Sequence, residues 1–539
     1  MADPKSHSHL LPGATLQDGL THEMDHERWS RRAFIRSVGL AGAGSMLLGQ
    51  MPVTALSASP LAWLLGAAET DRILVLIRLK GGNDGQNMII PVHDYSTYKS
   101  RRPQIAVPNA DILSLSPESG MPKSMEPLLR MWQDGGMKVV HSIGYPEQNL
   151  SHFRSSDIWG SASDSAVTEP SGWMGRWLDG RFPDFLTAPP AMPPAVQIGG
   201  FGNLLFLNDQ NINLSFVVSD PKELADIAQT GQLFDTTNLP ACYYGEQLGY
   251  LRAVTNSTFR YAGVISAAYN QGKNSETYGP GLGEQLAIVA RLIKGNLGTR
   301  VYMVTLDGFD NHANQYQTHQ NLLKELAGAV RHFFDDLKTG GWHEKVLAMT
   351  MSEFGRRLEQ NASLGTDHGA AAPLMVFGPG LNGNGFIGKA PKFSDVDQVG
   401  NLKFQTDFRE VYATVLEQWL CVPGAEVDEV LGRPFNRIHS LGLSCNATPV
   451  FEPRKPEVIP MSVAYHDGYL WLEFELPASA PVDVMLFNMQ GQQLWKKSLG
   501  KLPAGPYREQ LGIPANLPAG AQVITVRAGN ALGSRKMIR

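Results

Sequence analysis

The sequence has few cysteines and no excess of basic residues, and each absence excludes a class of protein. Three cysteines in 539 residues, Cys242, Cys421 and Cys445, are too few for a disulfide framework, and no CxxC pair is present to bind zinc. An oxidising compartment would allow one bridge, between Cys421 and Cys445. Lys and Arg number 46 against 51 Asp and Glu. Because the basic residues are not clustered either, we expect no nucleic-acid partner.

Long apolar runs are also lacking. The small-residue run Val38–Leu48 is too short and too rich in glycine to span a bilayer stably, so we expect no transmembrane segment in the mature chain. It follows the sequence SRRAFIR at 30–36, which resembles a twin-arginine export signal. The basic start of an amphipathic helix is the alternative interpretation. Small residues between 57 and 68 offer cleavage sites, and we set residues 1–68 apart as a signal region.

Several strand-like segments in the body of the chain are bordered by polar residues. Apolar runs suited to buried strands cover 71–79, 301–305, 345–350 and 372–377. Carboxylate and imidazole residues follow the first three runs and precede the fourth: Asp84, Asp307, Asp310, His312, Glu353, Asp367 and His368. The alternation of strand, acidic loop, helix and strand predicts an α/β fold with a doubly wound, mainly parallel sheet flanked by helices.

Ligands of an open α/β sheet lie at the carboxyl ends of its strands. Oxygen and imidazole groups crowded at that edge are what a divalent metal ion requires. Any one of these segments could instead be an ordinary turn, with Asp side chains capping the next helix. Four such segments together favour a metal site.

A further strand is predicted over 137–143, and a helix begins after it, near Ser151 and His152. Ser151 fits a helix N-cap, where its hydroxyl would meet free backbone N–H groups. A helix N-terminus also stabilises an alkoxide and the anion that it attacks, so Ser151 is also a candidate nucleophile. A metal or a base would have to take its proton. His152 is adjacent in sequence, which does not show that the two side chains face each other.

With these residues laid out, the segment 71–422 resembles the bacterial family catalogued as domain of unknown function 1501. The motifs that carry the resemblance are GGNDGQN, NLSHF, LDGFDNHANQ, TMSEFGRR and GTDHG. The family is placed in the alkaline phosphatase and sulfatase superfamily and has no established activity. The resemblance therefore implies a fold and a class of chemistry, and no substrate.

The resemblance also implies roles for individual residues. Ser151 falls on the superfamily's nucleophile, and the metal ligands fall on Asp84, Asp307, Asp310, His312, Glu353, Asp367 and His368. Ser352 and Glu353 stand where the superfamily usually has Asp-His, and this departure removes an imidazole. The loss would shift the metal preference from zinc toward magnesium, manganese or calcium, or would mean that catalysis has been lost.

The composition changes after Cys445. Residues 446–460 contain PRKPEVIP and predict a linker, and the alternation in YLWLEFEL and VDVMLFNM predicts a small β-sandwich over 461–539. Its closing strand and basic tail resemble the sorting domain of the type IX secretion route. A carbohydrate-binding β-sandwich is the alternative. Signal and sorting domain together predict a protein exported to the periplasm and then to the cell surface or medium, with both export machineries as partners.

Two functions remain open for the domain at 71–445. The first is a hydrolase that depends on divalent metal ions (zinc, magnesium, manganese or calcium) and acts on phosphate or sulfate esters of small molecules or glycans. The second is a catalytically inactive cell-surface binding or assembly protein that keeps the same alkaline phosphatase-like fold.

Overall fold

The computed structural model describes residues 70–445 and 459–538, apart from short gaps at 187, 200–202, 231–233, 235–238, 240–242, 467–468, 477–478, 489–492, 515–519 and 529–530. The chain divides into two compact units, Met1–Cys445 and Asn446–Arg539. The twin-arginine segment, most of the predicted linker and Cys242 lie outside the described residues.

A central sheet organises the first unit. Strand β1 (Ile73–Leu79) lies between β8 (Val301–Leu306) and β9 (Val346–Met351) and is parallel to both. The residues from Ile73 to Ile77 are all buried, as expected for a strand covered on both faces. The full order is β13-β5-β12-β9-β1-β8-β6-β7, with β14 also paired to β5. The remaining strands are β5 (Met137–Gly144), β6 (Ala195–Ile198), β7 (Ser215–Val218), β12 (Ala372–Phe377), β13 (Gly385–Ile387) and β14 (Thr406–Asp407).

One strand of this sheet is reversed. Strand β12 is antiparallel to both β5 and β9, whereas the other pairings in the sheet are parallel. Its amino end therefore lies at the edge where β1, β5, β8 and β9 have their carboxyl ends, which we call the carboxyl edge. The predicted α/β fold with a mainly parallel sheet is confirmed. The reversed direction was not predicted, because an apolar run that is buried on both faces has the same pattern in either direction.

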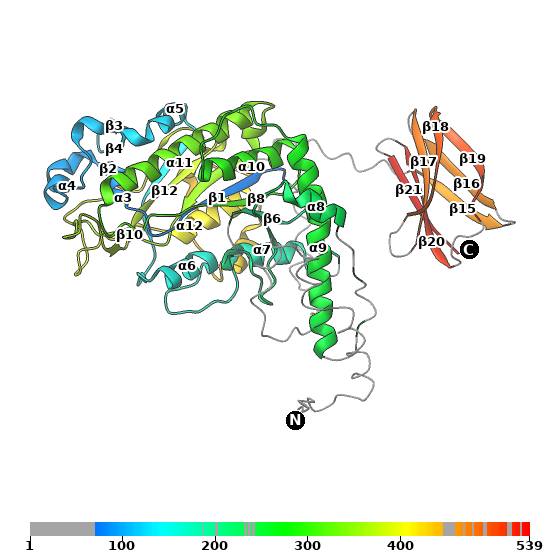
Figure 1. The fold of residues 1–539 in the computed structure, drawn as a ribbon, viewed down its shortest axis with the longest axis horizontal. Helices are drawn as coiled ribbons and strands as arrows, with labels where there is room; N and C mark the ends of the chain where they lie inside the picture. The colour runs from blue at the N-terminus through cyan, green and yellow to red at the C-terminus, as the bar shows by residue number, and fades with distance from the viewer. Residues whose placement is uncertain are drawn as a thin grey trace, which may run out of the picture. The chain divides into compact units, whose positions relative to one another are not determined.

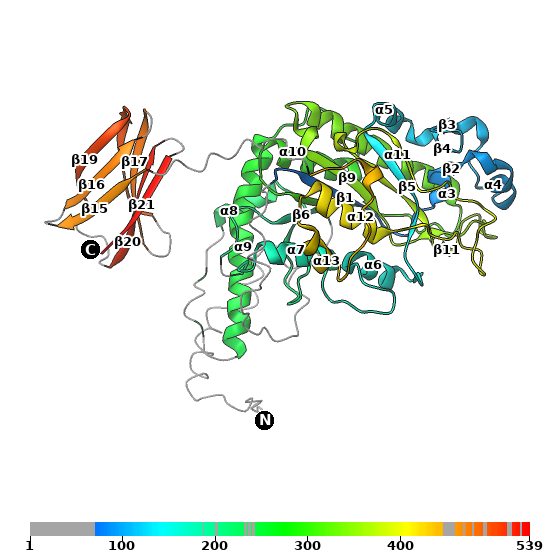
Figure 2. The same ribbon diagram turned by 180° about the vertical axis from the view of Figure 1, so that it is seen from behind.

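Helices cover both faces of the sheet. Figure 1 shows α10 (Leu282–Lys294) and α11 (Gln315–Lys338) on one side, and α6 (His152–Ser161) and α7 (Trp173–Arg181) on the other. Figure 2 shows the same division from behind. Among the helices of the described residues, which include α9 (Tyr243–Gln271), none combines the length and the apolar character needed to cross a membrane.

A disulfide bond joins Cys421 and Cys445 near the end of the first unit. This is the one bridge that the sequence allowed. It closes a segment that follows α12 (Phe408–Thr414) and contains α13 (Gly424–Val430).

The second unit consists of two antiparallel sheets with one shared core. Strands β15 and β19 flank β16 in one sheet, and the other has the order β18-β17-β20-β21. Buried residues of β16, such as Leu470 and Leu472, belong to the same apolar cluster as Val482 and Val484 of β17. The predicted β-strand character is confirmed, whereas the sorting role stays a prediction. The strands are β15 (Met461–His466), β16 (Tyr469–Leu476), β17 (Ala480–Asn488), β18 (Gln493–Leu502), β19 (Gly505–Gly512), β20 (Ala521–Ala528) and β21 (Ala531–Ile538).

Candidate metal centre

The loops that carry the predicted site residues meet at the carboxyl edge of the central sheet. The loops after β1, β5, β8 and β9 leave from this edge because the four strands run in the same direction, and the chain returns to it before β12. These loops carry, in chain order, Asp84, Ser151, Asp307, Asp310, His312, Glu353, Asp367 and His368. Residues almost three hundred positions apart are thus placed on one rim.

Two glycines let the loop after β1 pack closely against its neighbours. Gly81 has a φ of +113°, and a Cβ atom there would lie 2.5 Å from the backbone nitrogen of Asp310. Gly82 has a φ of +78°, and a Cβ atom there would overlap the ring of Phe354. The buried guanidinium of Arg356 donates to the carbonyl oxygens of both glycines. The backbone beside Asp310 is therefore held in place by close packing and by hydrogen bonds.

Three imidazoles gather around one carboxylate oxygen. Oδ1 of Asp310 lies 3.0 Å from Nε2 of His312 and 3.3 Å from Nε2 of both His152 and His368. The Nε2 atoms of His312 and His368 are 2.9 Å apart. Among the described residues, His152, Asp310 and His368 each offer one ligand atom within 4.8 Å of one another. We call these three residues and His312 the metal centre.

Hydrogen bonds on the far side of two rings assign their tautomers. Nδ1 of His152 lies 2.6 Å from Oε2 of Glu353, and Nδ1 of His368 lies 2.8 Å from the carbonyl oxygen of Leu150. Both oxygens accept, so the Nδ1 atoms carry the protons and, in the neutral rings, each Nε2 has a lone pair. Nε2 of His152 is buried and has no hydrogen-bond partner. In their neutral forms, the rings of His152 and His368 therefore turn a nitrogen lone pair toward the Asp310 carboxylate.

This arrangement fits a divalent metal ion. Lone pairs that face a carboxylate oxygen repel it unless a cation lies between them. Imidazole and carboxylate are ligands of zinc and of other first-row divalent metals. Histidine ligands usually donate their second ring N–H to a carboxylate or a backbone carbonyl, as His152 and His368 do.

The ionisation states at the centre also suit metal binding. Partial burial raises the pKa of Asp310, but the hydrogen bond and charge of Arg356, at 2.7 Å, and the neighbouring histidines lower it to about 2. Burial lowers the pKa of His368 and outweighs the hydrogen bond to Leu150, which raises it. At neutral pH the centre therefore presents a carboxylate and neutral imidazole, the forms that bind metals.

Asp84 lies at the same edge but in a separate, buried network. Its Oδ2 accepts hydrogen bonds from Nη1 of Arg102, at 2.6 Å, and from Nε2 of Gln315. Burial raises the pKa of Asp84, but the charge and hydrogen bond of Arg102 more than offset burial, so that the pKa is lowered. Within the described residues, no hydrogen bond or ion pair joins Asp84 to the metal centre. The structure thus does not bring this predicted ligand to the centre.

Three other predicted residues lie around the rim. The exposed Asp307 pairs with Nζ of Lys80 at 2.6 Å. Oδ1 of Asp367 is 3.8 Å from Nδ1 of His312, which is too long for a hydrogen bond. Ser151 is exposed and stands at the N-cap of α6, but its side chain makes no capping hydrogen bond. The expected N-cap position is therefore found without the expected bond.

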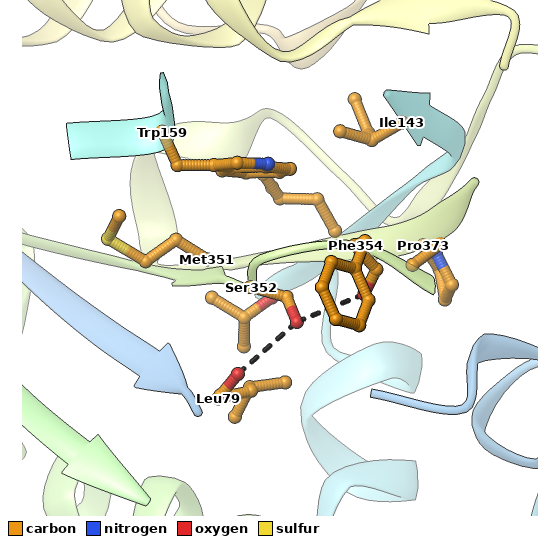
Figure 3. A pocket seen from close by; sticks show the side chains of 10 residues that line it. Leu79, Ile143, Trp159, Met351, Ser352, Phe354 and Pro373 are labelled. Atoms are coloured by element: carbon orange, nitrogen blue, oxygen red, sulfur yellow. Dashed lines mark hydrogen bonds between the residues drawn. The ribbon is translucent and has the colours of Figure 1, made fainter. Parts of the chain in front are cut away.

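The two residues at the unusual Ser-Glu pair have distinct contacts. The Ser352 hydroxyl lies 3.2 Å from the carbonyl oxygen of Leu79 and 3.4 Å from that of Phe354, and it accepts a hydrogen bond from the N–H of Asn83. Figure 3 shows this hydroxyl between Leu79 and Phe354, beside a small, mostly apolar pocket. Ser352 thus joins the end of β9 to the end of β1, whereas Glu353 contacts His152 instead of pointing at Asp310.

Sequence reasoning missed His152 as a metal-centre residue and considered it only as a neighbour of Ser151. The chain has a second histidine near the same strand end, His141, which lies buried in β5 and stacks on Phe386. Residue type alone does not separate the two. The useful signal was position, because His152 follows the predicted strand end and opens a helix at the carboxyl edge.

Comparisons with known proteins agree in part with the resemblance seen in the motifs. Residues 262–441 match the model of a family described as protein of unknown function, DUF1501. No curated protein sequence matches the chain. The family resemblance is therefore confirmed over this segment, which contains three of the four metal-centre residues.

Solved structures with similarity include a protein in the alkaline phosphatase superfamily from Vibrio parahaemolyticus. It is 10% identical, with 95% of this chain and 91% of that chain covered and a TM-score of 0.28. A sulfatase from Pseudoalteromonas sp. is 10% identical, with 81% and 83% covered and a TM-score of 0.32. A β-glucuronidase from Parabacteroides merdae matches only over 15% of this chain and 12% of its own length, at 13% identity and a TM-score of 0.12.

Proposed function

We propose that the chain is a metal-dependent hydrolase of the alkaline phosphatase and sulfatase type, which acts on phosphate or sulfate esters of small molecules or glycans. The observation that carries this proposal is the convergence of three imidazole Nε2 atoms on one oxygen of Asp310. A metal bound there supplies Lewis acidity and lowers the pKa of an attacking hydroxyl group.

The donor set favours zinc. The ligand atoms of His152, His368 and Asp310 all lie within 4.8 Å of one another, and two imidazoles with one carboxylate suit zinc and similar first-row metals. Magnesium and calcium prefer oxygen ligands. The Ser-Glu pair at 352 and 353 lacks the imidazole usual in the superfamily, which had suggested a harder metal. His152, from the loop after β5, supplies an imidazole instead. This replacement supports a zinc centre despite the change at Glu353.

Ser151 is the proposed nucleophile. It immediately precedes His152, it is exposed, and its backbone N–H is bonded to Oδ1 of Asn149 at 2.9 Å. Because its hydroxyl makes no capping bond, the hydroxyl is available to a substrate. Free N–H groups at the start of the ten-residue helix α6 favour an anionic group at that position.

A specific observation supports the alternative of an inactive binding or assembly protein. Asp84, expected to hold metal, is instead paired with Arg102 in the interior. Ester hydrolysis with two metal ions needs ligands for both ions, and Asp84 provides no ligand to the metal centre. Both proposed functions allow one metal ion to bind, but only the hydrolase predicts that an ester is turned over.

We also propose that the protein is exported, with the twin-arginine and type IX machineries as partners and the cell surface or medium as its destination. The Cys421–Cys445 disulfide supports export, because such bonds persist mainly in oxidising compartments.

Metal analysis combined with ester assays tests the proposed function. The purified chain should carry zinc, which Asp310→Asn should lose, and it should hydrolyse aryl phosphates or aryl sulfates. Ser151→Ala should keep the metal and lose turnover. His332→Ala is the control, because this histidine lies on α11 and pairs with Glu276, away from the centre. Bound zinc without turnover on a broad ester panel would support the binding protein, and absence of both metal and turnover would contradict the proposal.

A further inference from the structure

We infer that Glu353 is a positioning residue that holds His152 in the ring orientation and tautomer which direct its Nε2 atom into the metal centre, and that Arg78 in turn holds Glu353. The inference rests on the proposed metal centre. It gives Glu353, predicted from the sequence as a ligand, a different role.

The contacts of Glu353 point away from a ligand role. Its Oε2 lies 2.6 Å from Nδ1 of His152, and its Oε1 lies 3.2 Å from Nη2 of Arg78. The Glu353 side chain is only 3% exposed. Since Nδ1 of His152 faces Glu353 while Nε2 faces Asp310, the imidazole ring stands between the two carboxylates. The Glu353 carboxylate therefore reaches the centre through His152.

Glu353 is itself held by two other parts of the chain, β1 and α6. Nη2 of Arg78, on β1, also donates to Oγ of Ser156 at 3.0 Å, on the helix that begins with His152. The Ser155 hydroxyl of the same helix donates to the backbone carbonyl of Glu353. These bonds link β1, the loop after β9 and α6. A buried carboxylate with two donors is stable in a single orientation, which it imposes on its histidine partner.

His312 differs from His152 in the contacts of its Nδ1 atom. Its Nδ1 is 3.8 Å from the nearest oxygen of Asp367, and its side chain is 46% exposed. Within the part of the chain that the structure describes, Nδ1 of His312 has no hydrogen bond comparable to the one between His152 and Glu353, and the contact of the His312 ring with His368 is on its Nε2 side. The two histidines thus contribute differently, with His152 set before metal binding and His312 free to adjust to the ion.

Zinc affinity measured on the full chain, stripped of metal and titrated against a chromophoric chelator, tests the inference. Glu353→Gln keeps the size of the side chain and removes the charge, and loss of such a partner costs about 10- to 100-fold in metal affinity. Glu276→Gln is the matched control, because Glu276 also contacts Nδ1 of a histidine, His332, at 3.2 Å, but away from the centre. The zinc affinity of Glu276→Gln should equal that of the wild type. Circular dichroism checks that both variants fold.

A double variant separates positioning from a general structural role. If Glu353 acts through His152, then His152→Ala and the pair His152→Ala/Glu353→Gln should have the same zinc affinity. Equal affinity of Glu353→Gln and wild type, or a further loss in the double variant, would overturn the inference.

The tautomer of His152 can be read without metal. In the stripped wild-type chain labelled with ¹⁵N-histidine, the resonances lost in His152→Ala should show a protonated Nδ1 and an unprotonated Nε2. Glu353→Gln should give a mixture of tautomers, and an unchanged tautomer would refute the positioning role. If the wild-type chain takes up no zinc, both the centre and the inference fail. Absence of ester turnover with the affinity differences intact would overturn only the hydrolase.

Discussion

Replacing Arg102 by Met should destabilise the first unit far more than the same change at its sequence neighbour Arg101. The Arg102 side chain has 0% exposure, pairs with Asp84, and donates to the carbonyl oxygens of Arg357 and Leu358, each at 2.7 Å. Arg101 pairs with Glu359 at the surface, where the two side chains are 51% and 62% exposed. The two substitutions remove the same chemical group from opposite environments.

The expected magnitudes follow from burial. Removing one partner of a buried ion pair costs roughly 3–5 kcal/mol, because the other charge stays buried without a partner. The two carbonyl oxygens that lose a donor add to that cost, at about 1–3 kcal/mol each as an upper range. We therefore expect Arg102→Met to cost about 5 kcal/mol or more. An exposed pair contributes about 0–1 kcal/mol, so Arg101→Met should change stability by no more than that.

Urea unfolding followed by tryptophan fluorescence measures both losses as changes in the free energy of unfolding. The pH adds a second criterion. The lowered pKa of Asp84 contributes stability above its unfolded pKa of about 4, and this contribution is lost as the pH falls through the folded pKa. Without Arg102, burial should raise the pKa of Asp84, so acid should relieve the destabilisation. The difference in the free energy of unfolding between Arg102→Met and the wild type should therefore become smaller at low pH. Equal costs for the two substitutions, or a gap that widens in acid, would refute the reasoning.

Three further predictions test other parts of the structure. Gly81→Ala should lower zinc affinity, because the added Cβ atom would displace the loop that carries Asp310. Gly341→Ala is the control, because Gly341 also has a positive φ but has open space around it. This control should keep the zinc affinity and lose only about 1–2 kcal/mol of stability through backbone strain. Asp336 is buried, which raises its pKa, but hydrogen bonds hold the pKa at about 2, so its stabilising contribution is present above about pH 4 and is lost toward pH 2. Asp336→Asn should therefore flatten the acid dependence of urea unfolding. Replacing Cys421 and Cys445 by Ser should cost about 3 kcal/mol, and a reductant should destabilise only the wild type.

The sequence was most informative where a local pattern determines the structure. The runs that became β1, β8 and β9 are continuous, apolar and followed by glycine or acidic residues, so their existence and shared edge could be predicted. The direction of β12 could not, since strand direction depends on pairing partners far away in the chain.

The site was predictable in its position and only partly in its membership. Asp310 and His368 were expected at the edge and lie in the metal centre. Asp84 has the same local context as Asp310, a glycine-rich loop after a buried strand, yet its carboxylate faces Arg102. Which cation a carboxylate faces is decided by tertiary packing, and residue type and spacing do not encode it. The same holds for Glu353, whose partners come from β1 and α6.

The reversed direction of β12 has a consequence for cleavage of the chain by proteases when a metal ion is bound. Strand β9 ends and β12 begins on the same rim, so residues 352–371 form one continuous, partly buried excursion that does not cross the sheet. That excursion carries His368, while Asp310 and His152 belong to other loops. A metal ion bound by His368, Asp310 and His152 would join residues 352–371 to the two loops that carry Asp310 and His152. Residues 352–371 could then unfold locally only after the ion is released. Zinc should therefore slow nicking by a protease between 352 and 371, and a chelator should restore it.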